Sequence, residues 1–319
     1  MNSKITVLMP VFNAEKYIGE AVQSVLHQSF RDFELLIVDD GCKDRSMEIV
    51  RRFNDPRILI VNQRKSGIAV ALNRGLHLAQ GEFIARFDAD DICYPQRLQK
   101  QYDFMKANPD YVLIGSDADY MDSEGVKIYY HNDLGHSHEE IQQTIYKKCP
   151  FIHSTVFYKT AVATKLGGYD AKAHSFEDYL FWTKFIAKGK VLNFNEPLIA
   201  VRFNPESFTV DEKRLGKNFL MLKKKVLESN DPITQKQEQL FLKVLNKVSS
   251  QKFKRYSYHL MLAKKYLWNN FQPSHARENI RAALGYKHYS IPALGLFILS
   301  FMPRVFISKL YHWIKLNTK

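Results

Sequence analysis

Short apolar runs alternate with segments of helical periodicity through the first 115 residues, and this alternation restricts the fold more than any other feature. Continuous apolar runs are typical of strands that helices cover on both faces. We therefore predict a βαβ series, which is an α/β fold with a mostly parallel, doubly wound sheet. The predicted strands are residues 6–10, 33–38, 58–61, 83–87 and 112–114. The predicted helices are residues 13–27 (with Asn13 as the N-cap), 45–53, 67–79 and 95–107.

The pattern changes after residue 115. The sequence there predicts a strand at residues 154–158 and helices at residues 139–146 and 177–187. Beyond residue 211 it predicts basic, aromatic helices at residues 219–227, 239–248 and 256–268. An apolar stretch at residues 291–307, interrupted by prolines, follows them.

The charge of the chain is concentrated near its C-terminus. The formal net charge is +13, but residues 1–210 sum to −2 and residues 211–319 to +15. Such asymmetry indicates a polyanionic partner for the C-terminal segment, either nucleic acid or an anionic membrane. The overall composition, 45% hydrophobic and 25% charged, excludes disordered and collagen-like classes.

Polar and acidic side chains gather where three predicted strands end. The first strand ends in a segment with Pro10, Phe12, Asn13 and Glu15, the second in Asp39-Asp40-Gly41, and the fourth in a segment with Asp88, Asp90 and Asp91. Ligands of parallel α/β sheets bind beyond these carboxyl ends. A divalent cation would relieve the repulsion between the carboxylates, and Asp-x-Asp suits Mg²⁺ or Mn²⁺ with substrate phosphates.

The acidic residues also have a purely structural interpretation. Aspartates are common in turns and at helix N-termini, so a single acidic turn would carry no functional meaning. Three acidic or polar strand ends on one rim favour a site. The sequence contains neither a Walker lysine loop nor a Gly-x-Gly-x-x-Gly segment, so a cation would have to balance phosphate charge.

In these motifs the chain resembles the family 2 glycosyltransferases of the GT-A fold. The resemblance covers residues 1 to about 205, and its motifs occur in the family's order. They are Val7-Leu-Met-Pro-Val-Phe-Asn-Ala-Glu-Lys-Tyr-Ile18, Leu36-Ile-Val-Asp-Asp-Gly41, Ala71-Leu-Asn-Arg-Gly-Leu76, Gly81-Glu-Phe-Ile-Ala-Arg-Phe-Asp-Ala-Asp-Asp91, His153-Ser-Thr-Val156, Gly167-Gly-Tyr-Asp170 and Phe176-Glu-Asp-Tyr-Leu-Phe-Trp182. Cys42 departs from the family, which usually has Ser after Asp-Asp-Gly.

The resemblance implies a role for each matching residue. A nucleotide base would lie among Pro10, Phe12, Asn13, Glu15 and Asp39, while Asp40 would brace the turn. Asp88 would face the ribose and diphosphate, and Asp90, with Asp88, would hold Mn²⁺ or Mg²⁺. Asp178 would be the catalytic base, Glu177 would orient it or contact the acceptor, and Arg202 would lie near the diphosphate.

The resemblance and the chemistry of sugar transfer together predict an inverting enzyme. It would move a hexosyl or N-acetylhexosaminyl group from a UDP-sugar to a hydroxyl of a glycan or lipid-linked acceptor, in polysaccharide or lipopolysaccharide biosynthesis. The metal would stabilise the leaving diphosphate, and Asp178 would deprotonate the hydroxyl. Helical spacing with Phe181, Trp182 and Phe185 predicts that Asp178 points inward, where its basicity would rise. His153 could line the cleft or be structural.

We expect a catalytic domain at residues 1–210, with a nucleotide-binding half at 1–115 and an acceptor half at 116–210. A basic helical region would follow at residues 211–319. The apolar residues 291–302 and the neighbouring Arg304, Lys309, His312, Trp313 and Lys315 favour an anionic membrane over nucleic acid as its partner, although a buried helix is the simpler alternative. Three widely spaced cysteines and no signal-peptide-like start predict a cytoplasmic protein, peripheral on the membrane.

Two other functions remain open at this point. A sugar-phosphate nucleotidyltransferase would share the α/β sheet and the metal, but it would need a Gly-rich basic loop near the N-terminus, which residues 10–17 do not provide. A non-catalytic membrane or nucleic-acid module would depend on the basic tail alone.

Overall fold

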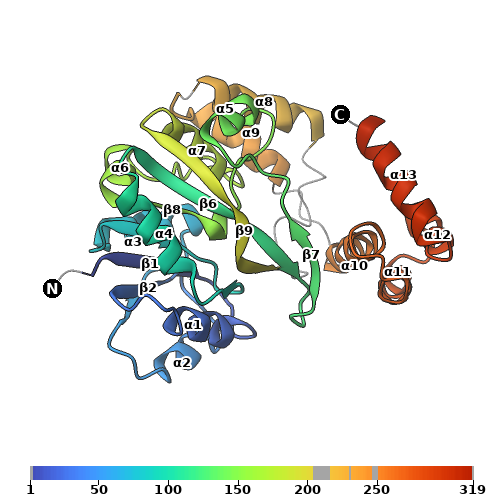
Figure 1. Cartoon of the computed structure of the whole chain (residues 1–319), viewed down its shortest axis with the longest axis horizontal. Helices are drawn as coiled ribbons and strands as arrows, with labels where there is room; N and C mark the ends of the chain where they lie inside the picture. The colour runs from blue at the N-terminus through green and yellow to red at the C-terminus, as the bar shows by residue number, and fades with distance from the viewer. Residues whose placement is uncertain (1–2, 204–215, 230, 246–250, 318–319) are drawn as a thin grey trace. The chain divides into compact units, whose positions relative to one another are not determined.

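A nine-stranded mixed sheet organises the protein, in the order β3-β2-β1-β4-β8-β6-β9-β5 with β7 paired to β6. Figure 1 labels strands β1, β2, β6, β7, β8 and β9. In this computed structural model, residues 3–203, 216–229, 231–245 and 251–317 are described. The α/β fold class predicted from the sequence is confirmed. The strands are β1 (Ile5–Val11), β2 (Phe33–Asp39), β3 (Ile58–Asn62), β4 (Phe83–Arg86), β5 (Ile92–Cys93), β6 (Tyr111–Met121), β7 (Lys127–His131), β8 (Phe157–Lys159) and β9 (Lys190–Arg202).

The parallel part of the sheet places three strand ends on one rim. Strand β1 is buried along its whole length and pairs in parallel with β2 and β4. Val11 lies opposite Asp39, and Leu8 lies opposite Arg86. The segments that leave these three strands therefore begin side by side.

The other part of the sheet is antiparallel. Strand β8 runs antiparallel to both β4 and β6, and β5 runs antiparallel to β9. The predicted sheet was mostly parallel because apolar runs report burial and not strand direction. Strand β9 was not predicted, because Asn193, Asn195 and Glu196 interrupt its apolar residues.

Seven helices accompany the strands up to residue 203. They are α1 (Ile18–Leu26), α2 (Ser46–Arg51), α3 (Ile68–Leu78), α4 (Arg97–Ala107), α5 (His138–Thr144), α6 (Thr160–Lys165) and α7 (Glu177–Ile186). Helix α1 begins later than predicted, and Tyr17, not Asn13, is its N-cap residue. Asn13 instead has φ 50°, a left-handed conformation that removes it from the helix.

The chain forms two compact units. The first comprises residues 1–118, 131–201 and 217–243, and the second comprises residues 119–130, 202–216 and 244–319. Helices α8 (Gly216–Ser229) and α9 (Gln235–Leu245) fall almost wholly in the first unit. The second contains α10 (Gln251–Trp268), α11 (Pro273–Tyr286), α12 (Ile291–Leu299) and α13 (Arg304–Asn317). The proposed boundary at residue 210 stays a prediction.

Each unit has its own apolar core. In the first, Leu8, Leu36 and Ile84 of the parallel strands join Trp182 and Phe185 of α7 in one buried cluster. In the second, Tyr258, Leu262 and Tyr266 of α10 pack with residues of α11 and α12.

Gly81 provides a test of this packing. An added Cβ there would lie 2.3 Å from the backbone nitrogen of Thr6 in β1, which cannot move without breaking the sheet. We expect Gly81→Ala to lower the free energy of unfolding by about 3 kcal/mol, measured by urea denaturation. Gly285→Ala, whose Cβ would meet nothing within 4 Å in α11, is the matched control and should be neutral or stabilising. Equal effects of the two substitutions would contradict the packing.

Candidate active site

The loop after β1 is fastened to the loop after β2. The Asn13 side-chain oxygen accepts a hydrogen bond from the Lys43 backbone at 2.8 Å, and the Glu15 carboxylate accepts one from the Arg45 backbone at 3.1 Å. The Ala14 backbone donates to the Ser46 hydroxyl at 2.7 Å. Asn13 and Glu15 therefore shape the surface at this rim, because their side chains join two strand ends.

Cys42 completes this junction as a neutral thiol. Its sulfur accepts a hydrogen bond from the Asn13 backbone at 3.3 Å, and its own backbone donates to Asp39 at 2.8 Å. Burial raises the pKa of Cys42 to about 12, so the thiol stays protonated at neutral pH. The departure from the family's usual serine thus leaves a hydrogen-bonded turn in place.

Asp40 braces the neighbouring loop, as its place in the motif predicts. Its carboxylate accepts hydrogen bonds from the Gln63 side chain at 2.7 Å and from the backbones of Ser66 and Gly67 at 2.8 and 2.9 Å. The side chain is buried, and three donors compensate for its desolvation. The Asp40 carboxylate therefore has a structural role: its hydrogen bonds hold the loop after β3.

Phe12 offers a ring at the same rim. Its side chain is 39% exposed, and the Lys65 ammonium lies 3.6 Å from the ring centroid. This is a cation–π contact, and it places a positive charge beside an aromatic surface. An aromatic ring next to a cation suits a base linked to phosphates.

Arg86 connects the end of β4 to the rest of the site. Its side chain is 1% exposed and forms an ion pair with the partly exposed Asp88 carboxylate. The Asp88 backbone donates to the Ser154 hydroxyl at 3.0 Å, which joins this strand end to the segment before β8.

The residues after β4 fit a divalent cation that also binds a ligand phosphate. The described residues contain no group of three or more His, Cys, Asp or Glu side chains able to enclose a metal ion. Mg²⁺ is usually held by one or two carboxylates together with substrate phosphates and water, so it needs no such enclosure. Asp88 forms an ion pair with Arg86, and Asp90 follows two residues later in the sequence. The assignment of both carboxylates to a cation stays a prediction.

Two carboxylates open helix α7. Glu177 is buried, and burial together with the charge of Asp178 raises the pKa of Glu177 to about 7. The Asp178 side chain is 24% exposed and accepts a hydrogen bond from the Tyr179 backbone at 2.6 Å. Glu177 is therefore the more buried of the two carboxyls, while Asp178 is partly buried beside His153. Helix α7 is buried on almost every side, so spacing along it could not separate the two.

His153 lies next to Asp178. Its Nδ1 is 3.9 Å from an Asp178 oxygen, and its Nε2 is 3.4 Å from the Tyr169 hydroxyl. Burial, with a smaller contribution from the charge of Arg86, lowers the pKa of His153 well below its usual value. A neutral imidazole thus lies beside the carboxylate, and whether His153 lines a cleft stays a prediction.

Helices α8 and α9 pack on the residue that precedes these carboxylates. The ring of Phe241 lies 5.0 Å from that of Phe176 and 5.1 Å from that of Phe219, centroid to centroid. Lys223 lies over the rings of both Phe176 and Tyr179. Figure 1 shows α8 and α9 near α7. The sequence placed these helices in a separate region because helical periodicity does not show which surface a helix covers.

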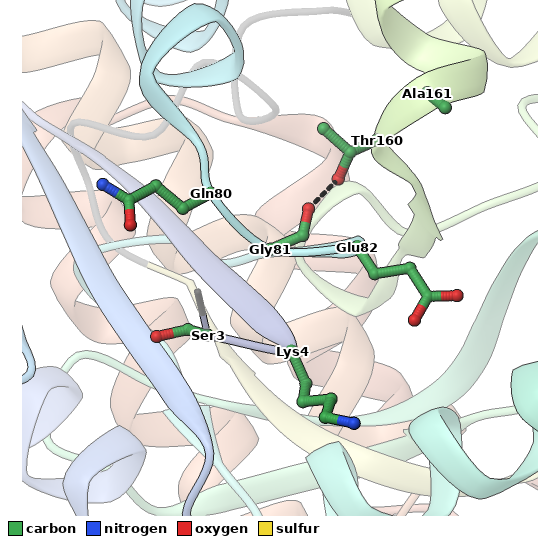
Figure 2. A pocket seen from close by; sticks show the side chains of 7 residues that line it. All are labelled: Ser3, Lys4, Gln80, Gly81, Glu82, Thr160 and Ala161. Atoms are coloured by element: carbon green, nitrogen blue, oxygen red, sulfur yellow. Dashed lines mark hydrogen bonds between the residues drawn. The ribbon is translucent and has the colours of Figure 1, made fainter. Parts of the chain in front are cut away.

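A pocket elsewhere on the first unit is separate from this rim. It is lined by Ser3, Lys4, Gln80, Gly81, Glu82, Thr160 and Ala161 (Figure 2). Lys4 and Glu82 directly precede β1 and β4, so the pocket lies at the amino ends of strands whose carboxyl ends carry the acidic residues. The Thr160 hydroxyl donates to the Gly81 carbonyl at 2.7 Å across it.

Arg202 belongs to the second unit. There it is buried and donates a hydrogen bond to the Ser123 carbonyl at 3.3 Å. Its predicted place near a diphosphate stays a prediction. The remaining predicted residues, including Pro10, Asp39, Asp90 and the α7 pair, all lie in the first unit.

The mixed α/β sheet, with acidic strand ends and a carboxylate pair at the start of a helix, is typical of GT-A glycosyltransferases. The model of glycosyl transferase family 2 matches residues 6–164. The chain is 31% identical over 217 residues to the putative glycosyltransferase EpsE of Bacillus subtilis, covering 65% of this chain and 77% of EpsE. The protein belongs to glycosyltransferase family 2 and is a glycosyltransferase.

Two further comparisons extend the likeness. The amylovoran biosynthesis glycosyltransferase AmsE of Erwinia amylovora is 29% identical over 221 residues, which are 67% of this chain and 81% of AmsE. The structure of TarS residues 1–349 from S. aureus in complex with UDP-GlcNAc matches with a TM-score of 0.57 and 19% identity. That match covers 97% of this chain and 92% of TarS 1–349, and it confirms the fold.

The buried carboxyl of Glu177 should make stability depend on pH. Because its pKa in the folded protein exceeds the ordinary value of 4.5, the folded state holds a proton that the unfolded state releases between pH 4.5 and about 7. The free energy of unfolding of the wild type should therefore fall across this range relative to Glu177→Gln, by on the order of 2 kcal/mol. Urea denaturation at pH 5 and pH 8 measures this difference, and parallel pH profiles would contradict the raised pKa.

Phe241 tests the support that α8 and α9 give to helix α7. We expect Phe241→Ala to lower kcat about tenfold or more through displacement of α7, with little change in KM for the donor. Phe241→Leu should recover most of the activity, and Leu240→Ala, an exposed neighbour, should have no effect. If Phe241→Ala folds and keeps full kcat, α9 does not position the carboxylates.

Proposed function

We propose that the protein is an inverting glycosyltransferase that moves a sugar from a UDP-sugar to a hydroxyl group of its acceptor. The observation that carries this proposal is the partly exposed carboxylate of Asp178, next to a neutral imidazole and a protonatable Glu177. A carboxylate beside a neutral imidazole and a second carboxyl with a raised pKa is suited to accept a proton from an incoming hydroxyl. Direct displacement by that hydroxyl inverts the anomeric centre.

The nucleotide would bind at the rim formed by the ends of β1, β2 and β4. In this proposal the base lies among Pro10, Phe12, Asn13, Glu15 and Asp39. The fastened loops support it because they pre-organise the surface that the base would meet. The UDP-GlcNAc named in the TarS complex supports uridine as the base.

The diphosphate would lie beside Asp88 and Asp90, just after β4. Asp90, with Asp88, would hold a Mn²⁺ or Mg²⁺ ion, which would supply Lewis-acid stabilisation of the leaving diphosphate. The ion pair with buried Arg86 orients the Asp88 carboxylate.

Glu177 and Asp178 would have different roles in proton transfer. Around neutral pH the buried Glu177 is partly protonated, which limits repulsion between the two carboxylates. Asp178 takes the proton of the acceptor hydroxyl, and Glu177 orients Asp178 or the acceptor. His153 is neutral and does not compete as an acid.

We further propose that the acceptor is a glycan or a lipid-linked sugar in surface polysaccharide biosynthesis, at the cytoplasmic face of the membrane. The name of the similar AmsE, an amylovoran biosynthesis glycosyltransferase, supports this setting. The three cysteines are free, which agrees with a reducing compartment.

Replacement of Asp178 tests the proposal. We expect Asp178→Asn to lower kcat about 100-fold or more, with donor binding retained, because the amide cannot accept the proton. Release of UDP from a panel of UDP-hexoses and UDP-N-acetylhexosamines measures this, with the exposed Asp103→Asn on α4 as control. NMR of the product's anomeric carbon reports inversion.

Three results would contradict the proposal. Full activity of Asp178→Asn would show that Asp178 is not the catalytic base. Retention of configuration at the anomeric centre would exclude direct displacement. Release of pyrophosphate from UTP and a sugar phosphate would identify a nucleotidyltransferase instead.

A further inference from the structure

Helix α12 is apolar on its exposed face as well as on its buried face. Ala293 and Leu296 are buried in the core of the second unit. Ile291, Leu294 and Ile298 lie on the opposite side and are 86%, 49% and 61% exposed. A helix that is hydrophobic all round is normally covered on every side.

Exposed apolar side chains continue into helix α13. They are Phe301, 65% exposed, then Val305 and Phe306, and Trp313, 63% exposed. Val305 and Trp313 are eight residues apart, so they share one face of the helix. We call these seven side chains of residues 291–313 the α12–α13 surface.

The charges around this surface have one sign. After Glu278 the sequence contains no acidic residue, whereas six lysines and arginines follow it. Among them, Arg304 and Lys309 are exposed within α13. Arg277 donates a hydrogen bond to the Ser300 carbonyl at 3.0 Å and lies 4.9 Å from the Phe301 ring, which fixes the end of α12.

We propose that the α12–α13 surface inserts into the interfacial layer of an anionic lipid bilayer. The charge complementarity selects this occupant, because an apolar surface on a segment whose only charged residues are cations attracts negatively charged head groups, while a second copy would bring the same cations face to face. The inference rests on the proposed membrane setting and assigns the surface that makes the contact.

The helices would lie in the plane of the membrane. Helix α12 has nine residues and α13 has fourteen, fewer than the about 20 needed to span the hydrocarbon core. Among the residues that the structure describes, no helix is both long and apolar enough to cross a membrane. Trp313 and the aliphatic side chains would reach the acyl boundary, with Arg304 and Lys309 at the level of the head groups.

Flotation of the full chain with vesicles tests the assignment. We expect binding to phosphatidylcholine vesicles that contain about one third phosphatidylglycerol, and at least tenfold weaker binding to phosphatidylcholine alone. Ile298→Ser with Phe301→Ser, and separately Arg304→Glu with Lys309→Glu, should each weaken binding about tenfold or more. Met221→Ser, an equally exposed apolar side chain on α8, is the control and should leave binding unchanged.

The outcomes separate this inference from the proposed activity. Release of UDP from the donor without lipid should be the same in all variants, since the substitutions lie in the second unit. Vesicle binding that survives both double substitutions, or that is equal on neutral and anionic vesicles, would overturn the assignment. So would a dimer in light scattering that Ile298→Ser with Phe301→Ser dissociates, because the surface would then be a subunit interface.

Discussion

The ion pair between buried Arg86 and Asp88 is the interaction on which the site depends. A guanidinium that is 1% exposed needs partners that compensate for its desolvation, and the Asp88 carboxylate is one of them, so the pair orients Asp88. The same charge contributes to keeping His153 neutral and acts on Glu177. Arg86 thereby couples the rim that would hold a diphosphate to the helix that carries the carboxylates.

Arg97 forms a hydrogen bond with the backbone of Arg86. Its side chain is fully buried, and it donates hydrogen bonds to the carbonyls of Arg86 and Val156 at 2.8 and 3.3 Å. These carbonyls belong to the segments around β4 and β8, which run antiparallel. Arg97 therefore joins the end of β4 to the segment before β8, and Arg86 joins the end of β4 to Asp88. These buried polar contacts determine the geometry of the rim.

The sequence predicted what depends on local pattern. The parallel strands follow from the apolar runs, while the bracing role of Asp40 follows from the resemblance to the family. Strand direction, strand β9 and the buried state of Glu177 depend on contacts between distant segments, and periodicity does not record these. Likewise, nothing in residues 217–243 indicates that Phe241 packs against Phe176. The charge of the C-terminal segment was visible in composition, but only the structure separates the exposed face of α12 from its buried face.

The central claim is that the acidic rim binds a nucleotide diphosphate together with a divalent cation. Calorimetric titration of UDP into the protein with and without Mn²⁺, in the wild type and in Asp90→Ala, tests it most directly. The account predicts UDP binding that needs Mn²⁺ and weakens at least about tenfold in Asp90→Ala, while Asp103→Asn binds as the wild type does. UDP affinity that is independent of Mn²⁺ and equal in wild type and Asp90→Ala would contradict it.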